Sequence, residues 1–180
     1  MTPKKPYIPK LTETYFYNSA MYYLQRFAAP EAQLRLVLQR KVIRAAMKGA
    51  EIPAECPQWI EKAVEKCIKL GFVNDQVFAE QKALSMRRQG KARNFIATTL
   101  QQKGVDKELI RDILNKDGEQ DADAEMKAAI RTVKRKRLGR DDTPEGRQKD
   151  LAKLVRGGFS MDVARRALAT KGDSDQTEEE

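Results

Sequence analysis

Two stretches of the chain, LQQKGVDKELIRDIL at residues 100–114 and LVRGGFSMDVARRAL at residues 154–168, align with each other at an offset of 54 residues. In both, a helical apolar pattern reaches a glycine, an apolar residue follows, and a polar residue then opens a new helical pattern. Glycine accepts the left-handed backbone that ends many helices, and aspartate or serine caps the start of the next helix. The matched positions share this chemistry: Gly104 with Gly158, Val105 with Phe159, and Asp106 with Ser160.

Helical spacing of apolar residues continues on both sides of these stretches. It predicts helices over about 15–28, from Pro30 through Val42, and from Trp59 to the glycine at position 71. Three helices are too few to enclose a large core, so neighbouring groups must pack together. The sequence therefore predicts an all-α fold: a tandem repeat of three three-helix units in an elongated array. We call these units the first, second and third repeats.

Proline and charge mark the two ends of the chain. The first ten residues contain three prolines, and the last ten, KGDSDQTEEE, are acidic and lack apolar side chains. Such segments do not build packed helices. We expect a flexible basic arm over 1–14, the first repeat over 15–72, the second over 73–117, the third over 118–170 and a disordered acidic tail over 171–180.

The residue types present exclude most enzyme chemistry. The 180-residue chain has no histidine, which excludes a His-based triad and histidine metal sites. Its two cysteines, Cys56 and Cys67, form no CxxC pair. We expect them to be reduced thiols near packed helices, the alternative being a disulfide or a reactive thiol. Neither a phosphate-binding glycine loop nor a GxSxG elbow occurs. We therefore predict no enzyme activity, no metal and no cofactor.

The hydropathy of the chain bears on its location in the cell. The mean hydropathy is −0.68, and no apolar run approaches the roughly 20 residues that a membrane helix needs. The first ten residues have lysines but no apolar stretch of the kind that a secretory signal contains. We expect a cytoplasmic protein without a membrane anchor.

The charge of the chain implies an acidic partner. Lys and Arg number 35 against 26 Asp and Glu, which gives a net charge of +9. Nucleic acid or an acidic protein surface would complement this charge. Two basic clusters are candidate partner-binding residues: Arg87, Arg88, Lys91 and Arg93 at a predicted helix–helix junction, and Lys134, Arg135, Lys136, Arg137 and Arg140 at the end of the third repeat's first helix. The alternative for each cluster is a solvated helix face.

Aromatic residues crowd the first predicted helix: Tyr15, Phe16, Tyr17, Tyr22, Tyr23 and Phe27. Such rings can stack on the bases of a single strand. Rings at helical spacing are more often core, and we favour that interpretation here. We assign Trp59 to the core as well.

The order of these motifs resembles the RecX family of recombinase regulators. The resemblance rests on LGFVNDQVFAE at 70–80, RRQGKARNFIATTLQQKGVD at 87–106 and RGGFSMDVARRAL at 156–168. The helix at 15–28 and the residues Gln33–Leu34–Arg35 resemble the opening unit of the family, so about 15–169 are covered. The resemblance implies a cytoplasmic bacterial protein that binds the RecA recombinase, lies along its nucleoprotein filament, and inhibits or modulates strand exchange and ATP hydrolysis. Its place would be homologous recombination, DNA repair and the SOS response.

A second hypothesis follows from the charge alone. The chain could be a direct DNA-binding helical module, on single or double strands, that acts without a recombinase partner. Affinity for bare DNA would then fall steeply with salt, since cations that contact phosphates displace counterions. No heptad run that would form a dimer interface is present, so we expect a monomer.

Overall fold

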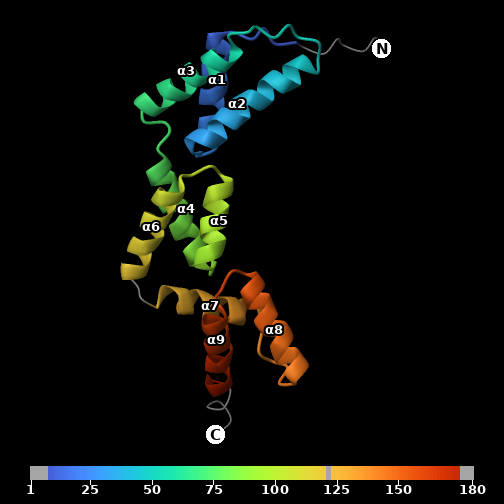
Figure 1. Ribbon diagram of the computed structural model, residues 1–180, viewed down its shortest axis with the longest axis vertical. Helices are drawn as coiled ribbons and strands as arrows, with labels where there is room; N and C mark the ends of the chain where they lie inside the picture. Colours follow the sequence, from blue (N-terminus) through green and yellow to red (C-terminus); the bar gives the residue numbers. More distant parts are fainter. Residues whose placement is uncertain (1–7, 121–122, 175–180) are drawn as a thin grey trace. The chain divides into compact units, whose positions relative to one another are not determined.

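The computed structural model describes residues 8–120 and 123–174, and these residues form nine α-helices and no strand (Figure 1). The all-α prediction is therefore confirmed for the described chain, and the helices fall into three consecutive groups of three. They are α1 (Glu13–Leu24), α2 (Glu31–Ala46), α3 (Cys56–Lys69), α4 (Asp75–Arg88), α5 (Arg93–Gln102), α6 (Lys107–Gln120), α7 (Ala124–Lys136), α8 (Pro144–Arg156) and α9 (Met161–Ser174). None of the helices in these ranges is long and apolar enough to cross a bilayer.

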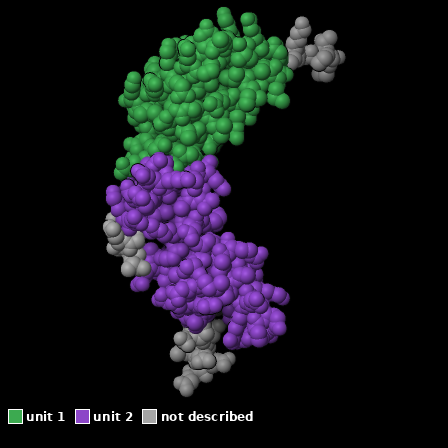
Figure 2. Space-filling model, in the orientation of Figure 1, with its two compact units in different colours: residues 1–78, 103–105 green, residues 79–102, 106–180 purple. Residues whose placement is uncertain are grey.

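The chain contacts divide into two compact units (Figure 2). The N-terminal compact unit comprises residues 1–78 with 103–105, and the C-terminal compact unit comprises 79–102 with 106–180. The greater part of the second repeat therefore shares a compact unit with the third. The boundaries of the three repeats stay a prediction, as does their elongated arrangement.

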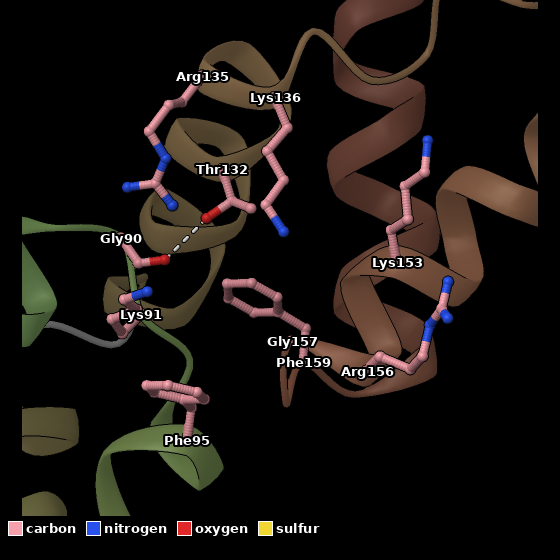
Figure 3. A pocket seen from close by; sticks show the side chains of 10 residues that line it. All are labelled: Gly90, Lys91, Phe95, Thr132, Arg135, Lys136, Lys153, Arg156, Gly157 and Phe159. Carbon is pink, nitrogen blue, oxygen red and sulfur yellow. Dashed lines mark hydrogen bonds between the residues drawn. The ribbon is translucent and has the colours of Figure 1, made fainter. Parts of the chain in front are cut away.

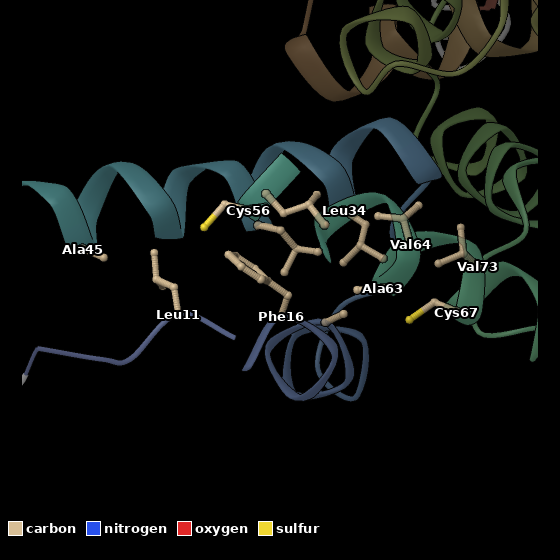
Figure 4. Close-up of a cluster of buried hydrophobic side chains, with 12 residues drawn as sticks. Leu11, Phe16, Leu34, Ala45, Cys56, Ala63, Val64, Cys67 and Val73 are labelled. Atoms are coloured by element: carbon tan, nitrogen blue, oxygen red, sulfur yellow. The ribbon is translucent and has the colours of Figure 1, made fainter. Parts of the chain in front are cut away.

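The core of the N-terminal compact unit forms where α1, α2 and α3 meet (Figure 4). Phe16 of α1 is fully buried and lies among Leu34 of α2 and Val64 of α3. Leu34 and Leu38 are one helical turn apart, as an inward face requires. Leu11 is 3% exposed and belongs to the same core, so the predicted boundary of the flexible arm at residue 14 lies too far along the chain.

A side-chain cap fixes the beginning of α1. The Tyr15 N–H donates to the Thr12 hydroxyl at 3.1 Å, so α1 starts at Glu13 and not at residue 15. Residues 1–7 of the predicted arm lie outside the described residues. At the other end, α9 runs to Ser174, beyond the predicted tail boundary at 171, and residues 175–180 lie outside the described chain.

Most of the aromatic residues of the first helix belong to the core. Phe16 is fully buried, while Tyr15, Tyr17 and Tyr23 are partly buried against the same cluster, as is Trp59 of α3. Two rings do not follow the prediction, because Tyr22 is 61% exposed and Phe27 is 54% exposed. Tyr22 lies in the last turn of α1 and Phe27 lies just beyond the helix, and the Arg26 guanidinium is 5.8 and 5.9 Å from the two ring centres.

The two cysteines are buried free thiols, as expected. Cys56 opens α3 and Cys67 lies near its end, and both contribute to the core of the N-terminal compact unit. Burial raises the pKa of both thiols, because it disfavours the thiolate. They act as small apolar side chains here.

A second core fills the third repeat and reaches into the second. Helices α7 and α8 both pack on α9. Their buried side chains gather around Leu154 and Phe159, and Ala92, which precedes α5, is part of the same cluster. One continuous core thus spans the junction of these two repeats, which explains why they form one compact unit.

The glycine-ended helices follow the predicted pattern. Gly104 and Gly158 have φ of 84° and 94°, and the apolar residues after them, Val105 and Phe159, are buried. The end of α7 differs, because the residue in the left-handed conformation there is not a glycine. Arg137 takes the left-handed position with φ of 52°, and the Leu138 N–H donates to the Val133 carbonyl at 3.0 Å. Leu138 is 2% exposed, so its burial fixes the left-handed turn at Arg137, two residues before Gly139.

Candidate partner-binding surface

Arg87, the first residue of the predicted basic clusters, lies inside the molecule. Its side chain is 9% exposed, and its guanidinium donates to a Glu125 carboxylate oxygen at 2.6 Å. The pair joins α4 of the second repeat to α7 of the third. Arg87 therefore holds the two repeats together, and we withdraw it from the partner-binding set.

Glu125 also caps the next helix. The Arg93 N–H at the start of α5 donates to both Glu125 carboxylate oxygens, at 3.1 and 3.2 Å. The Arg93 guanidinium turns the other way and donates to the Leu114 carbonyl and the Asn115 side chain, both at 2.6 Å. Arg93 is thus committed to packing α5 on α6, and of the first cluster only Arg88 and Lys91 remain for a partner.

The linker between α4 and α5 lies against α7. Gly90 has φ of 72°, and its carbonyl accepts a hydrogen bond from the buried Thr132 hydroxyl at 2.7 Å. A Cβ at Gly90 would lie 3.2 Å from the Ala128 carbonyl oxygen, so only glycine fits without displacing α7. Arg135 donates to the Gln89 carbonyl from the same helix. These contacts bring Lys91 of the first predicted cluster beside Arg135 and Lys136 of the second.

The two clusters meet in a cavity of about 350 Å³ at the junction of the second and third repeats (Figure 3). We call it the basic pocket, and its lining residues come from the α4–α5 linker, α5, α7, α8 and the α8–α9 turn. They are Gly90, Lys91, Phe95, Thr132, Arg135, Lys136, Lys153, Arg156, Gly157 and Phe159. Five of the ten are cationic, and no carboxylate from the described residues lines the pocket.

The cations of the basic pocket differ in how far they are already neutralised. Lys153 forms an ion pair with Asp150 at 2.9 Å. The Lys91 ammonium lies 4.9 Å from the centre of the Phe95 ring. Within the described ranges, Lys136 and Arg156 form no ion pair. Several like charges held close together raise the local potential and attract an anion.

Three predicted residues of the second cluster lie outside the basic pocket. Lys134, Arg137 and Arg140 are exposed, and none of them lines the cavity. Lys134 and Arg140 lie on either side of the turn that Arg137 forms at the end of α7. They add positive charge to the surface and stay candidates for partner contact.

Sequence reasoning missed Lys153 and Arg156. Both lie in the last turn of α8, immediately before Gly157 and Gly158. A usable signal was present, since Arg87 and Arg88 occupy the same place before Gly90 at the end of α4. Basic residues before a helix-ending glycine thus recur at both junctions of the pocket. In the part of the chain that the structure describes, no group of three Cys, Asp or Glu side chains could hold a metal ion.

Fold and site together define a class: an all-helical protein of three-helix repeats that presents a basic, aromatic-lined pocket. Comparison with known proteins makes this specific. The family model described as "RecX, second three-helix domain" matches residues 74–114. The regulatory protein RecX of Myxococcus xanthus (strain DK1622) is 36% identical over 175 residues, which covers 92% of this chain and 89% of that protein. The regulatory protein RecX of Agrobacterium fabrum is 30% identical, with 84% and 80% covered.

The chain belongs to the RecX family, a family of regulatory proteins. Solved structures agree at the level of the fold. The crystal structure of RecX from Lactobacillus salivarius superposes with a TM-score of 0.64 at 19% identity and covers 88% of this chain and 95% of that one. A second crystal structure of regulatory protein RecX gives a TM-score of 0.66 at 20% identity, with 85% and 70% covered.

Proposed function

We propose that this protein binds the RecA recombinase and its nucleoprotein filament in the cytoplasm, and inhibits or modulates strand exchange and ATP hydrolysis. The observation that carries the proposal is family membership across 92% of the chain, with relatives named regulatory protein RecX. Membership of this family implies a role in recombination. The basic surface adds physical support, because a filament of protein on DNA is rich in phosphate.

The basic pocket favours a second candidate, a DNA-binding module that acts without a recombinase. Five cations around one cavity would bind a polynucleotide through its phosphates whether or not a second protein were present. The two candidates differ in the concentration at which the protein acts. A filament regulator works below the concentration that occupies bare DNA, whereas a simple competitor works only above it.

The test measures ATP hydrolysis by a bacterial RecA on single-stranded DNA while this protein is titrated in. Binding to the same bare DNA is followed in the same buffer by fluorescence anisotropy. We expect half-maximal inhibition well below the dissociation constant for bare DNA. Inhibition only where free DNA is saturated would favour the DNA-binding module, and no inhibition at any concentration would contradict the filament regulator.

A further inference from the structure

We propose that the basic pocket is a binding site for single-stranded DNA, in which the cations hold the phosphate backbone and a base stacks against Phe95. This inference deepens the proposed function and rests on it for the source of the strand, which is the DNA inside the filament. It assigns the pocket to the nucleic acid and not to an acidic segment of the recombinase.

Charge converges on the pocket from three separate segments. Lys91 comes from the α4–α5 linker, Arg135 and Lys136 from α7, and Lys153 and Arg156 from α8. In the described chain only Lys153 has a carboxylate partner among them, Asp150 at 2.9 Å. A single carboxylate from a protein would leave most of this charge unbalanced. A polynucleotide carries one charge on every residue, so successive phosphates can meet successive cations.

An aromatic ring is exposed where the charges meet. Phe95 is 41% exposed although it lines the cavity, whereas Phe159 is 4% exposed and forms part of the wall toward the core. Figure 3 shows the two rings with Lys136 and Lys91 around them. An exposed ring among cations is the combination that single-strand binding sites use, since bases stack on the ring while the cations follow the backbone. A duplex keeps its bases stacked internally, so the ring favours a single strand.

The pocket is already built without a ligand. The Gly90–Thr132 and Gln89–Arg135 hydrogen bonds hold the linker on α7. A Cβ at Gly158 would lie 3.1 Å from the Phe95 nitrogen, so the α8–α9 turn packs closely on the start of α5. The walls come from elements that share one core, and little ordering is needed on binding. The size, about 350 Å³, fits a nucleotide-sized ligand.

The test measures binding of a fluorescein-labelled oligo-dT by anisotropy at several salt concentrations, with the full-length chain. The pocket variant is K136A/R156A, which removes two of the four pocket cations that form no ion pair in the described ranges. The matched control is K149A/R165A, which removes the same charge from exposed positions outside both the pocket and the two predicted basic clusters. We expect the pocket variant to bind at least about tenfold more weakly and to lower the salt slope by roughly 1.4, the value for two single-strand phosphate contacts.

Stacking is tested separately with Phe95→Leu, which keeps an apolar side chain and so protects the fold. We expect roughly tenfold weaker binding with an unchanged salt slope, because stacking releases no counterions. Equal losses in K136A/R156A and K149A/R165A would overturn the pocket site in favour of diffuse charge. Unchanged oligo-dT binding by both pocket variants, with loss of binding to a poly-glutamate peptide instead, would assign the pocket to protein.

The outcome is separable from that of the proposed function. Inhibition of RecA by the wild-type chain tests the function, and oligo-dT binding by the variants tests the pocket. A wild type that inhibits, with pocket variants that bind oligo-dT normally, would overturn the pocket alone. A wild type that never inhibits, with pocket variants that lose oligo-dT, would support the site and contradict the regulator.

Discussion

Arg87 and Glu125 form a largely buried ion pair at the junction between repeats. The Arg87 side chain is 9% exposed and that of Glu125 is 27% exposed, and Glu125 also accepts from the Arg93 N–H. Removing the Glu125 carboxylate takes away both the ion pair of a buried arginine and the hydrogen-bond acceptor of the Arg93 N–H. We therefore expect Glu125→Ala to lower the free energy of unfolding by about 3 kcal/mol.

Urea denaturation followed by circular dichroism measures this change. The control is Glu65→Ala, which removes an exposed pair with Lys69 at 3.9 Å and should change stability by less than about 1 kcal/mol. Equal effects of the two substitutions would contradict the buried role. A charge reversal at Arg87 would therefore test folding and not partner contact. Of the adjacent residues Arg87 and Arg88, Arg88 is the one whose charge reversal tests partner contact.

Asp150 sets a pH dependence of stability. Its side chain is 11% exposed, and burial opposes its charge, but hydrogen bonds from the Gly139 N–H at 2.8 Å and the Lys153 ammonium at 2.9 Å outweigh this. The net effect lowers the pKa of Asp150 below its ordinary value. A carboxyl whose pKa is lower in the folded state stabilises the fold above its unfolded pKa, and this is lost as the pH falls through the folded pKa.

The melting temperature of the wild type should therefore fall on acidification below about pH 4, in part through Asp150. Asp150→Asn should lower the free energy of unfolding at pH 7 by about 1.5–3 kcal/mol. The melting temperature of the variant should also fall less steeply than that of the wild type on acidification below about pH 4. Thermal melts of both proteins from pH 7 to pH 2 measure this. If the melting temperature falls as steeply with pH in the variant as in the wild type, other carboxylates, such as Glu61 beside Arg35, account for the loss of stability in acid.

At the scale of elements, the turn after α7 carries backbone strain. Arg137 is the one non-glycine residue with positive φ among those the structure describes. The left-handed conformation costs an ordinary residue about 1–2 kcal/mol and costs glycine almost nothing. We expect Arg137→Gly to raise the free energy of unfolding by about 1 kcal/mol. The control Arg137→Ala removes the same charge but keeps the strain, and it should leave the free energy of unfolding unchanged. If both variants are more stable than the wild type, the effect comes from the lost charge and not from the backbone.

The linker at Gly90 combines a left-handed backbone with a close approach to α7. Gly90→Ala should destabilise the chain by about 2 kcal/mol, because it adds a steric conflict to the conformational cost. Gly49→Ala is the matched control, since Gly49 has φ of 81° and no atom lies within 4 Å of the position that a Cβ would take there. It isolates the conformational cost alone. Equal losses in denaturation would show that α7 yields to the extra methyl group.

The helices could be predicted from the sequence because the signals that end and begin them lie in adjacent residues. The glycine, apolar residue and polar cap at 104–106 and 158–160 need no distant partner to form, and the structure has them as expected. Arg137 could not be foreseen in the same way. Its left-handed backbone follows from the burial of Leu138, which depends on the packing of the whole third repeat.

The candidate site was only partly predictable. Charge identified Lys91, Arg135 and Lys136, which do line the basic pocket. Charge could not separate them from Arg87 and Arg93, whose partners Glu125 and Leu114 lie more than 20 residues away in sequence. Charge also missed Lys153 and Arg156: basic residues recur before the helix-ending glycines, but only tertiary packing brings the end of α8 beside α5. These assignments depend on tertiary packing.

At the scale of the whole molecule, regulation requires that the basic pocket meets the filament. The repeats are joined firmly at the junction that holds the pocket, through the shared core and the Arg87–Glu125 pair. A partner therefore meets a surface of fixed geometry there. The pocket variants should lose regulation without losing their fold, since the side chains removed are at the surface.

The most direct measurement is inhibition of RecA-catalysed ATP hydrolysis on single-stranded DNA by the wild type, K136A/R156A and K149A/R165A. All three are first shown to have equal melting temperatures. We predict that K136A/R156A needs at least about tenfold more protein for half-inhibition, whereas K149A/R165A stays within about threefold of the wild type. Equal inhibition by all three proteins would contradict a role of the basic pocket in regulating the filament.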